Sequence, residues 1–160
     1  MIFTKAISYE DIQKELDKDN DIISLVGCET CVRVAGSGGQ VRMKKLAIKL
    51  REDGFNVKDG FLVPTACTPK LGFAKVSSDI NTILSMGCSA GTSNIKRFFP
   101  GYKVVETTVD VGLMIEDAKK ETLEITIPYD TYKQEVGQSF ETFTGVRKDS
   151  ASELPTKEAK

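Results

Sequence analysis

The sequence predicts an α/β fold, with an open, mostly parallel sheet, flanking helices, and a metal or cluster at the carboxyl edge of the strands. Two observations support this. Short apolar, β-branched runs alternate with amphipathic segments, and three of the runs lead into a loop that holds a cysteine. At 160 residues, 40% hydrophobic and 28% charged, the chain has the composition of one globular domain. Ligands of such sheets collect where the strands end, so the functional site is expected there.

The expected elements follow from periodicity and from end signals. A short helix should begin after Ser8, its N-cap, with Asp11 in the capping-box position. Further helices are expected at 40–53, where Gly54 supplies the stop, and at 89–99. Strands are expected at 22–26, within 55–63 around a turn at 58–60, at 80–86, at 102–109 and at 123–127. The stretch 129–143 forms a final amphipathic segment, and the prediction is one domain over 1–146 followed by a disordered polar tail over 147–160.

The charge balance excludes several partners. The chain has 22 basic and 23 acidic side chains and a net charge of −1, so it lacks the excess of cations that binding to nucleic acid or an anionic membrane needs. No apolar run approaches the roughly 20 residues that span a bilayer, and the first residues lack the order of a signal peptide. The expected location is therefore the cytoplasm, with no nucleic-acid and no membrane partner.

The complete absence of histidine excludes more chemistry than any other count. Without imidazole there is no Ser-His-Asp triad, no Cys-His nucleophile pair and no histidine-ligated zinc site. Any metal must therefore be bound by sulfur or oxygen.

The four cysteines form the most specific pattern in the chain. Cys28, Cys67 and Cys88 each come shortly after a predicted strand, and Cys31 completes a CxxC turn. Parallel strands end at one edge, so these residues should converge there. Four thiolates suit a tetrahedral Zn²⁺ or a [4Fe–4S] cluster, and the ligand set does not separate the two. Isolated core thiols and a thiol–disulfide pair are the alternatives.

A glycine-rich loop at 35–39 precedes the helix at 40–53 and should present free N–H groups to an anionic sulfur centre. It is neither a GxGxxG fingerprint nor a P-loop. Nearby basic side chains that would add compensating charge are Arg33, Arg42, Lys44 and Lys45. Asp110 is the one carboxylate expected at the functional edge, where it should cap a loop.

With these motifs described, the chain resembles the cysteine-rich C-terminal domain of bacterial methylenetetrahydrofolate reductases, which in acetogens and related anaerobes is a small partner subunit of the flavin-bearing reductase. The resemblance covers about residues 20–115. Its motifs are Val26-Gly27-Cys28-Glu29-Thr30-Cys31 with Gly38-Gly39, Ser85-Met86-Gly87-Cys88-Ser89-Ala90-Gly91, Pro100-Gly101 and 108–112. No cysteine stands near Ala35, where family members often have one, so the chain has ligands for one four-cysteine centre.

The resemblance implies an electron-transfer or assembly subunit that serves a flavoprotein in one-carbon metabolism and carries a [4Fe–4S] cluster. Its metal ligands would be Cys28, Cys31, Cys67 and Cys88, and the residues around the cofactor would be Gly27, Thr30, Gly38, Gly39, Gly87 and Ser89. Two alternatives stay open. One is a zinc-stabilised interaction module with the same ligands. The other is a small thiol-dependent enzyme, although the chain offers no evident general base.

Overall fold

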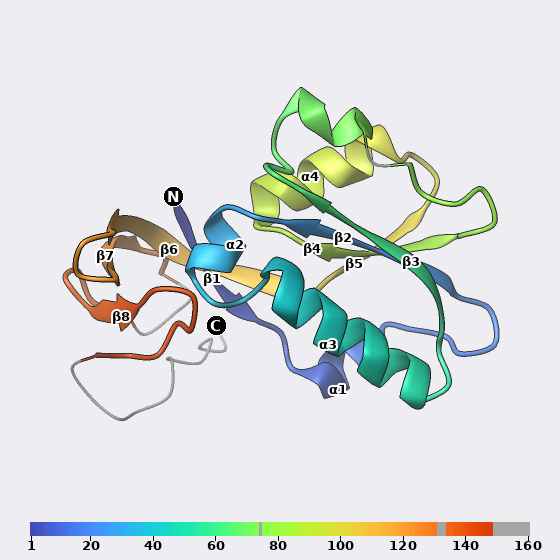
Figure 1. Ribbon diagram of the computed structural model, residues 1–160, viewed down its shortest axis with the longest axis horizontal. Helices are drawn as coiled ribbons and strands as arrows, with labels where there is room; N and C mark the ends of the chain where they lie inside the picture. Colours follow the sequence, from blue (N-terminus) through green and yellow to red (C-terminus); the bar gives the residue numbers. More distant parts are fainter. Residues whose placement is uncertain (74, 131–133, 149–160) are drawn as a thin grey trace.

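The computed structural model describes residues 1–73, 75–130 and 134–148, which form two four-stranded sheets and their helices (Figure 1). One sheet is parallel, with the order β3-β2-β4-β5, and the other is antiparallel, with the order β1-β6-β7-β8. The elements are β1 (Ile2–Ala6), α1 (Tyr9–Lys14), β2 (Ile22–Cys28), α2 (Cys31–Val34), α3 (Gly39–Glu52), β3 (Asn56–Val63), η1 (Pro69–Phe73), β4 (Thr82–Met86), α4 (Ser89–Phe98), β5 (Lys103–Glu106), β6 (Thr108–Asp117), β7 (Thr122–Pro128) and β8 (Ser139–Glu141).

The order of the parallel sheet creates a topological switch point at its carboxyl edge. The chain leaves β2 for its neighbour β3 and then crosses to β4 on the other side of β2. The strand order therefore reverses between β2 and β4, and ligands bind at such switch points in open α/β sheets. The pairing runs from Ile23↔Thr82 to Gly27↔Met86, so the two strands end level with each other.

The helices cover both faces of the parallel sheet, α3 on one and α4 with η1 on the other (Figure 1). Leu25 and Leu84 share the core with Leu50 of α3, and Ile83 packs with Ile95 of α4. Burial on both faces explains why β2 and β4 are near-continuous apolar runs. The expected cap is confirmed, because Ser8 Oγ accepts a hydrogen bond from the Asp11 N–H at 3.1 Å.

The α/β class with a parallel sheet is confirmed, but the chain is not mostly parallel. Half of the strands belong to the antiparallel sheet, which has its own core around Phe3, Leu123 and Phe140. The strand expected at 123–127 lies in this sheet, and its partners β6 and β8 run antiparallel to it. The strand expected at 102–109 is divided between the two sheets at Thr107, whose N–H and hydroxyl both bind the Ser85 carbonyl where the chain changes sheet.

One local expectation was wrong. Residues 58–60 do not turn, because β3 continues through them beside β2 with an irregular register. The helix expected after Ser8 is present as α1, but the strand before it, β1, was not predicted and pairs with β6. The described part of the amphipathic segment expected at 129–143 contains the short strand β8.

Most of the predicted tail, residues 149–160, lies outside the described residues. The first two residues of that tail are placed beside β8. Arg147 forms a bridge with Phe140, and the Lys148 N–H binds the Ser139 carbonyl at 3.0 Å. Among the described residues, no helix has both the length and the apolar character needed to cross a bilayer.

Candidate cysteine site

Three of the cysteines lie where β2 and β4 end. Cys28 is the last residue of β2, Cys31 is the first residue of α2, and Cys88 is the N-cap of α4, two residues after β4. The residues Cys28 and Cys88 are each only 6% exposed and belong to one apolar cluster, whereas Cys31 is half-buried. The parallel pairing of β2 with β4 therefore brings both arms of the CxxC turn to the beginning of α4.

Cys31 and Cys88 form a hydrogen-bonded pair of thiols. The hydrogen bond with Cys88 lowers the pKa of Cys31 to about 6 despite partial burial, and the Ile2 N–H helps to stabilise the thiolate. The same hydrogen bond raises the pKa of Cys88, with further contributions from burial and the negative charge of Asp110. Ionisation of the pair therefore favours Cys31, and the thiolate is the form of cysteine that acts as a nucleophile and binds metals.

The CxxC turn is tied to the loop that carries Cys67. The Cys28 thiol donates to Thr30 Oγ1 at 3.6 Å, and Thr30 Oγ1 donates to the Pro64 carbonyl at 2.6 Å. The Ala66 N–H in turn donates to Cys28 Sγ at 3.4 Å. The predicted site residue Thr30 thus links the two loops, and the backbone next to Cys67 contacts the sulfur of Cys28.

Cys67 itself is exposed. Its loop is held on both sides by Asn94 of α4, whose Nδ2 donates to the Ala66 carbonyl at 2.7 Å and to the Thr68 carbonyl at 3.0 Å. In the part of the chain that the structure describes, no three cysteine, aspartate or glutamate side chains are already arranged to hold a single metal ion. The structure thus places Cys28, Cys31 and Cys88 at the same edge of the parallel sheet without arranging them as a metal-binding group, and it places Cys67 on an adjacent, clamped loop.

The antiparallel sheet completes the wall of the site. Asp110 of β6 accepts two hydrogen bonds from the Ser89 N–H, at 3.0 and 3.2 Å, and one from the Ser89 hydroxyl. The sequence predicted that Asp110 caps a loop, but it caps the N-terminus of α4, and the predicted site residue Ser89 is its partner. Burial and the negative charge of Asp110 raise the pKa of the Tyr129 phenol, so Tyr129 lies close enough to Asp110 to feel its charge.

Residues that sequence reasoning missed come mainly from elements distant along the chain. Ile2 and Tyr129 belong to or follow strands of the antiparallel sheet, and Asn94 is an ordinary polar residue within a helix pattern. No local sequence signal marks them, since their proximity to the cysteines depends on how β6 pairs with β1 and on which face of α4 meets the Cys67 loop.

Among the predicted site glycines, Gly27 serves close packing. A Cβ on Gly27 would lie 2.9 Å from Leu62 Cδ2 and 3.0 Å from Met43 Sδ, so this glycine lets α3 approach β2. Gly87 lies beside Gly91, and a Cβ there would meet the Gly91 Cα at 3.7 Å, an ordinary van der Waals distance, so close packing does not by itself require a glycine at this position.

The two predicted site residues of the loop at 35–39, Gly38 and Gly39, pack against α2. The Gly38 N–H bonds to the Val32 carbonyl at 2.9 Å, and a Cβ on Gly38 would lie 2.6 Å from Val32 Cγ2. Gly39 has a φ of +83° and packs against the Arg33 side chain. The N–H of Gly38 is therefore engaged by α2 instead of facing the cysteines.

Of the four basic side chains expected to compensate the sulfur charge, the two arginines are engaged elsewhere, and Lys44 and Lys45 are exposed on α3. Arg33 pairs with Glu29 at 3.4 Å and lies over the Phe143 ring, 5.1 Å from its centroid. Arg42 donates to the Gly36 carbonyl at 3.0 Å. The groups that do reach sulfur are backbone N–H donors, from Ile2 to Cys31 and from Ala66 to Cys28.

Comparison of the chain with protein-family models, with curated proteins and with solved structures found no match. The functional argument therefore depends on the chemistry of this site. Its four thiols, its low-pKa thiolate and its N–H donors suit the binding of a thiophilic metal or cluster, or redox chemistry between Cys31 and Cys88.

Proposed function

We propose that this protein is a [4Fe–4S] electron-transfer or assembly subunit, with Cys28, Cys31, Cys67 and Cys88 as the ligands. Its partner would be a flavin-dependent methylenetetrahydrofolate reductase or a related one-carbon enzyme. One observation carries the proposal, namely that cysteines from both halves of the parallel sheet converge at its switch point. The choice of partner comes from the resemblance of the CxxC and Gly-Cys-Ser motifs.

The residues fit a thiolate-bound cluster in two respects. Ionisation of the Cys31–Cys88 pair favours Cys31, so this ligand gives up its proton more readily than an ordinary thiol. The Ala66 N–H donates to Cys28 Sγ, and such backbone donors stabilise cluster thiolates and raise the reduction potential. A bound cluster would supply one-electron transfer, while Cys28 and Cys88, nearly closed to solvent, would keep water from it.

Cys67 has a distinct role in this proposal. It is the exposed ligand, and its loop forms the solvent-facing side of the site. Asn94 binds the carbonyls before and after Cys67, so the loop has a defined position next to Cys28. The partner reductase would therefore approach from the side of the Cys67 loop, where the distance to an external electron acceptor is shortest.

The test is anaerobic purification followed by iron, sulfide and zinc analysis and a visible spectrum before and after dithionite. We expect about four irons and four sulfides per chain and a broad absorption that bleaches. The decisive variant is Cys67→Ser. An exposed thiol without structural contacts has no other reason to affect iron content, so we expect this variant to lose the cluster. Pro69→Ala, two residues later and also exposed, is the matched control and should retain it.

Three results would overturn the proposal. Full iron content in Cys67→Ser would show that the ligand set is wrong. About one zinc per chain without colour would identify a zinc-stabilised interaction module that uses the same thiolates. Absence of both metals, together with a Cys31–Cys88 disulfide that forms under mild oxidant, would favour a thiol-dependent redox protein, since the contact between those two sulfurs is what such chemistry needs.

A further inference from the structure

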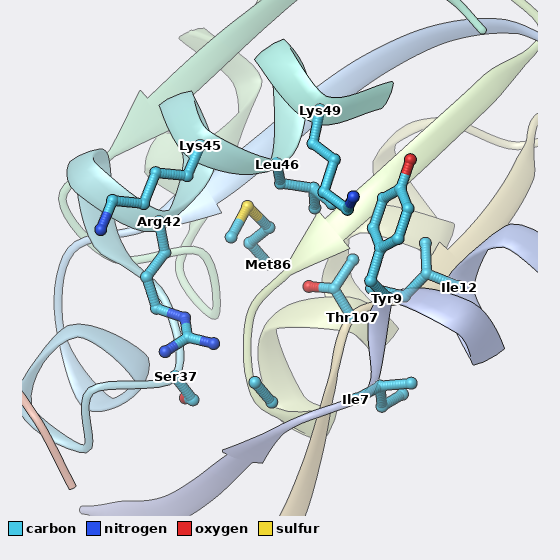
Figure 2. Close-up of a pocket in the computed structure, with 11 residues that line it drawn as sticks. Ile7, Tyr9, Ile12, Ser37, Arg42, Lys45, Leu46, Lys49, Met86 and Thr107 are labelled. Carbon is cyan, nitrogen blue, oxygen red and sulfur yellow. The ribbon is translucent and has the colours of Figure 1, made fainter. Parts of the chain in front are cut away.

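Figure 2 shows a pocket of about 310 Å³. Its lining residues Ile12 and Met86 belong to the core on one face of the parallel sheet, whereas Cys28 and Cys88 belong to the core on the other face. One side of the pocket is formed by α3, and the other by the end of β1 and the start of α1. Its size is at the lower end of the range of small-molecule sites. Neither the cysteine site nor the packing of the parallel sheet requires an open cavity at this place.

The interior of the pocket is apolar. Met86 lies between α3 and the chain around Ile7, and Leu46 and Ile12 complete the apolar lining (Figure 2). The ring of Tyr9 forms a wall whose position is fixed. Its hydroxyl donates to Asp53 Oδ2 at 2.6 Å, and the Lys49 ammonium lies 4.4 Å from the ring centroid. A flat apolar molecule would therefore meet a preformed surface there.

The rim of the pocket is positively charged along one helix face. Arg42, Lys45 and Lys49 follow one another at i, i+3 and i+7 on α3, and all three line the pocket. No acidic side chain is among the described lining residues. Asp53, which lies 4.0 Å from the Lys49 ammonium, is the nearest counter-charge in this group. This local excess of positive charge contrasts with the net charge of −1 for the whole chain.

Two of the three cations have donors to spare. Arg42 uses Nη1 to bind the Gly36 carbonyl, and its other guanidinium donors stay available. Lys45 makes no hydrogen bond or ion pair among the described residues. Both side chains are exposed, so neither pays a large desolvation cost in the empty pocket.

We infer that this pocket binds a small amphipathic anion, with an apolar or aromatic body against Tyr9 and Met86 and a carboxylate or phosphate against Lys45 and Arg42. The apolar interior supplies burial, and the cations supply charge-assisted hydrogen bonds at the mouth. The inference does not depend on the cluster, since the pocket lies on the other face of the sheet. Met86 is nevertheless only two residues before Cys88, so an occupant would contact the strand end that carries the cysteine site.

Isothermal titration calorimetry with two probes tests this inference. Naphthoate carries a carboxylate on an aromatic body, and naphthamide is its uncharged analogue of nearly the same shape. We expect naphthoate to bind more tightly than naphthamide, and added NaCl to weaken only naphthoate binding. Lys45→Gln should weaken naphthoate binding roughly five- to tenfold, which is the effect of losing one charge-assisted hydrogen bond.

Lys44→Gln is the matched control, because it removes the same charge from the neighbouring helix position outside the pocket lining. It should leave the affinity for naphthoate within about twofold of the original, as expected for a screened charge outside the site. If Lys45→Gln and Lys44→Gln weakened naphthoate binding equally, the effect would come from the overall positive charge of α3 and not from a contact in the pocket, and the inference would be overturned. Equal binding of naphthoate and naphthamide, or binding of neither, would also overturn it.

Discussion

Asp110→Asn separates the structural role of Asp110 from its electrostatic effect on Cys88. The carboxylate of Asp110 reaches from β6 to α4 and accepts hydrogen bonds from both the N–H and the hydroxyl of Ser89. Ser89 is the first residue of α4, and Cys88 is its N-cap without a side-chain cap of its own. The substitution keeps the size of the side chain but removes its charge and turns one acceptor into a donor.

Two contributions set the expected loss of stability. Loss of a helix cap costs about 0.5–2 kcal/mol, and loss of a negative charge at a helix N-terminus costs about 0.3–1 kcal/mol. Because the amide of asparagine still offers one acceptor, we expect a loss of about 1–2 kcal/mol in the free energy of unfolding. At about 2–4 °C per kcal/mol for a chain of this size, Tm should fall by about 2–8 °C.

The same substitution should make Cys88 easier to ionise. The charge of Asp110 is one of the causes that raise the pKa of Cys88, so its removal lowers that pKa and increases the thiolate fraction. The assays are thermal unfolding by circular dichroism and the rate of Cys88 alkylation by iodoacetamide in metal-free protein, followed by peptide mass spectrometry.

Glu116→Gln is the control for Asp110→Asn, since it removes an exposed carboxylate from the same strand away from α4. It should change the free energy of unfolding by less than about 0.5 kcal/mol. If Asp110→Asn and Glu116→Gln had the same Tm and the same alkylation rate, the contact between β6 and α4 would not be a cap and the reasoning would be refuted.

Two further predictions concern the frame around the site. Asp21 is buried, yet the Lys103 ammonium at 2.8 Å and other hydrogen-bond donors outweigh that burial and hold the pKa of its carboxyl below the ordinary value. Asp21→Asn should therefore lose about 1–3 kcal/mol at pH 7. The difference should begin to shrink as pH falls below about 4, the ordinary pKa of an Asp carboxyl, and should vanish only below the lowered pKa of the native carboxylate. Urea unfolding over a series of pH values from 7 downwards checks this. Gly36→Ala should cost more than Gly54→Ala in the same assay, because both glycines have a positive φ but only at Gly36 would the Cβ meet backbone, 2.4 Å from the Thr144 carbonyl carbon. Equal costs would show that the turn around Thr144 does not need to pack on Gly36.

The parallel sheet was predictable because its signals are local. β2 and β4 are buried on both faces and appear as uninterrupted apolar runs, and α3 shows helical spacing with Gly54 as its stop at φ +89°. The convergence of cysteines at the carboxyl edge followed from the same runs, since the ends of parallel strands share an edge. For Cys28 and Cys88, the position in the fold was therefore implied by the sequence before any long-range pairing was known.

The antiparallel sheet was not predictable from local pattern. Buried and exposed residues do not alternate along β1, so the strand lacks the usual period-two signal. Its pairing with β6 joins residues more than a hundred positions apart. The run at 102–109 has one composition throughout, yet its first half joins the parallel sheet and its second half leaves it. That division depends on tertiary hydrogen bonds of Thr107, which no spacing rule reveals. The exposure of Cys67 is likewise a property of how its loop is clamped by Asn94.

The division of the chain at Thr107 also determines where the cysteine site can be. The chain leaves the parallel sheet beside the end of β4, and Thr108 Oγ1 binds the Gly87 carbonyl at 2.7 Å, directly before Cys88. β6 therefore starts against the residue that precedes a predicted ligand, and β1, paired with β6, places the Ile2 N–H on Cys31. Both sheets thus contribute to the environment of the same two sulfurs. A group bound by them would stabilise the contact between the sheets, so its binding free energy would appear as stability of the whole domain and not of one loop.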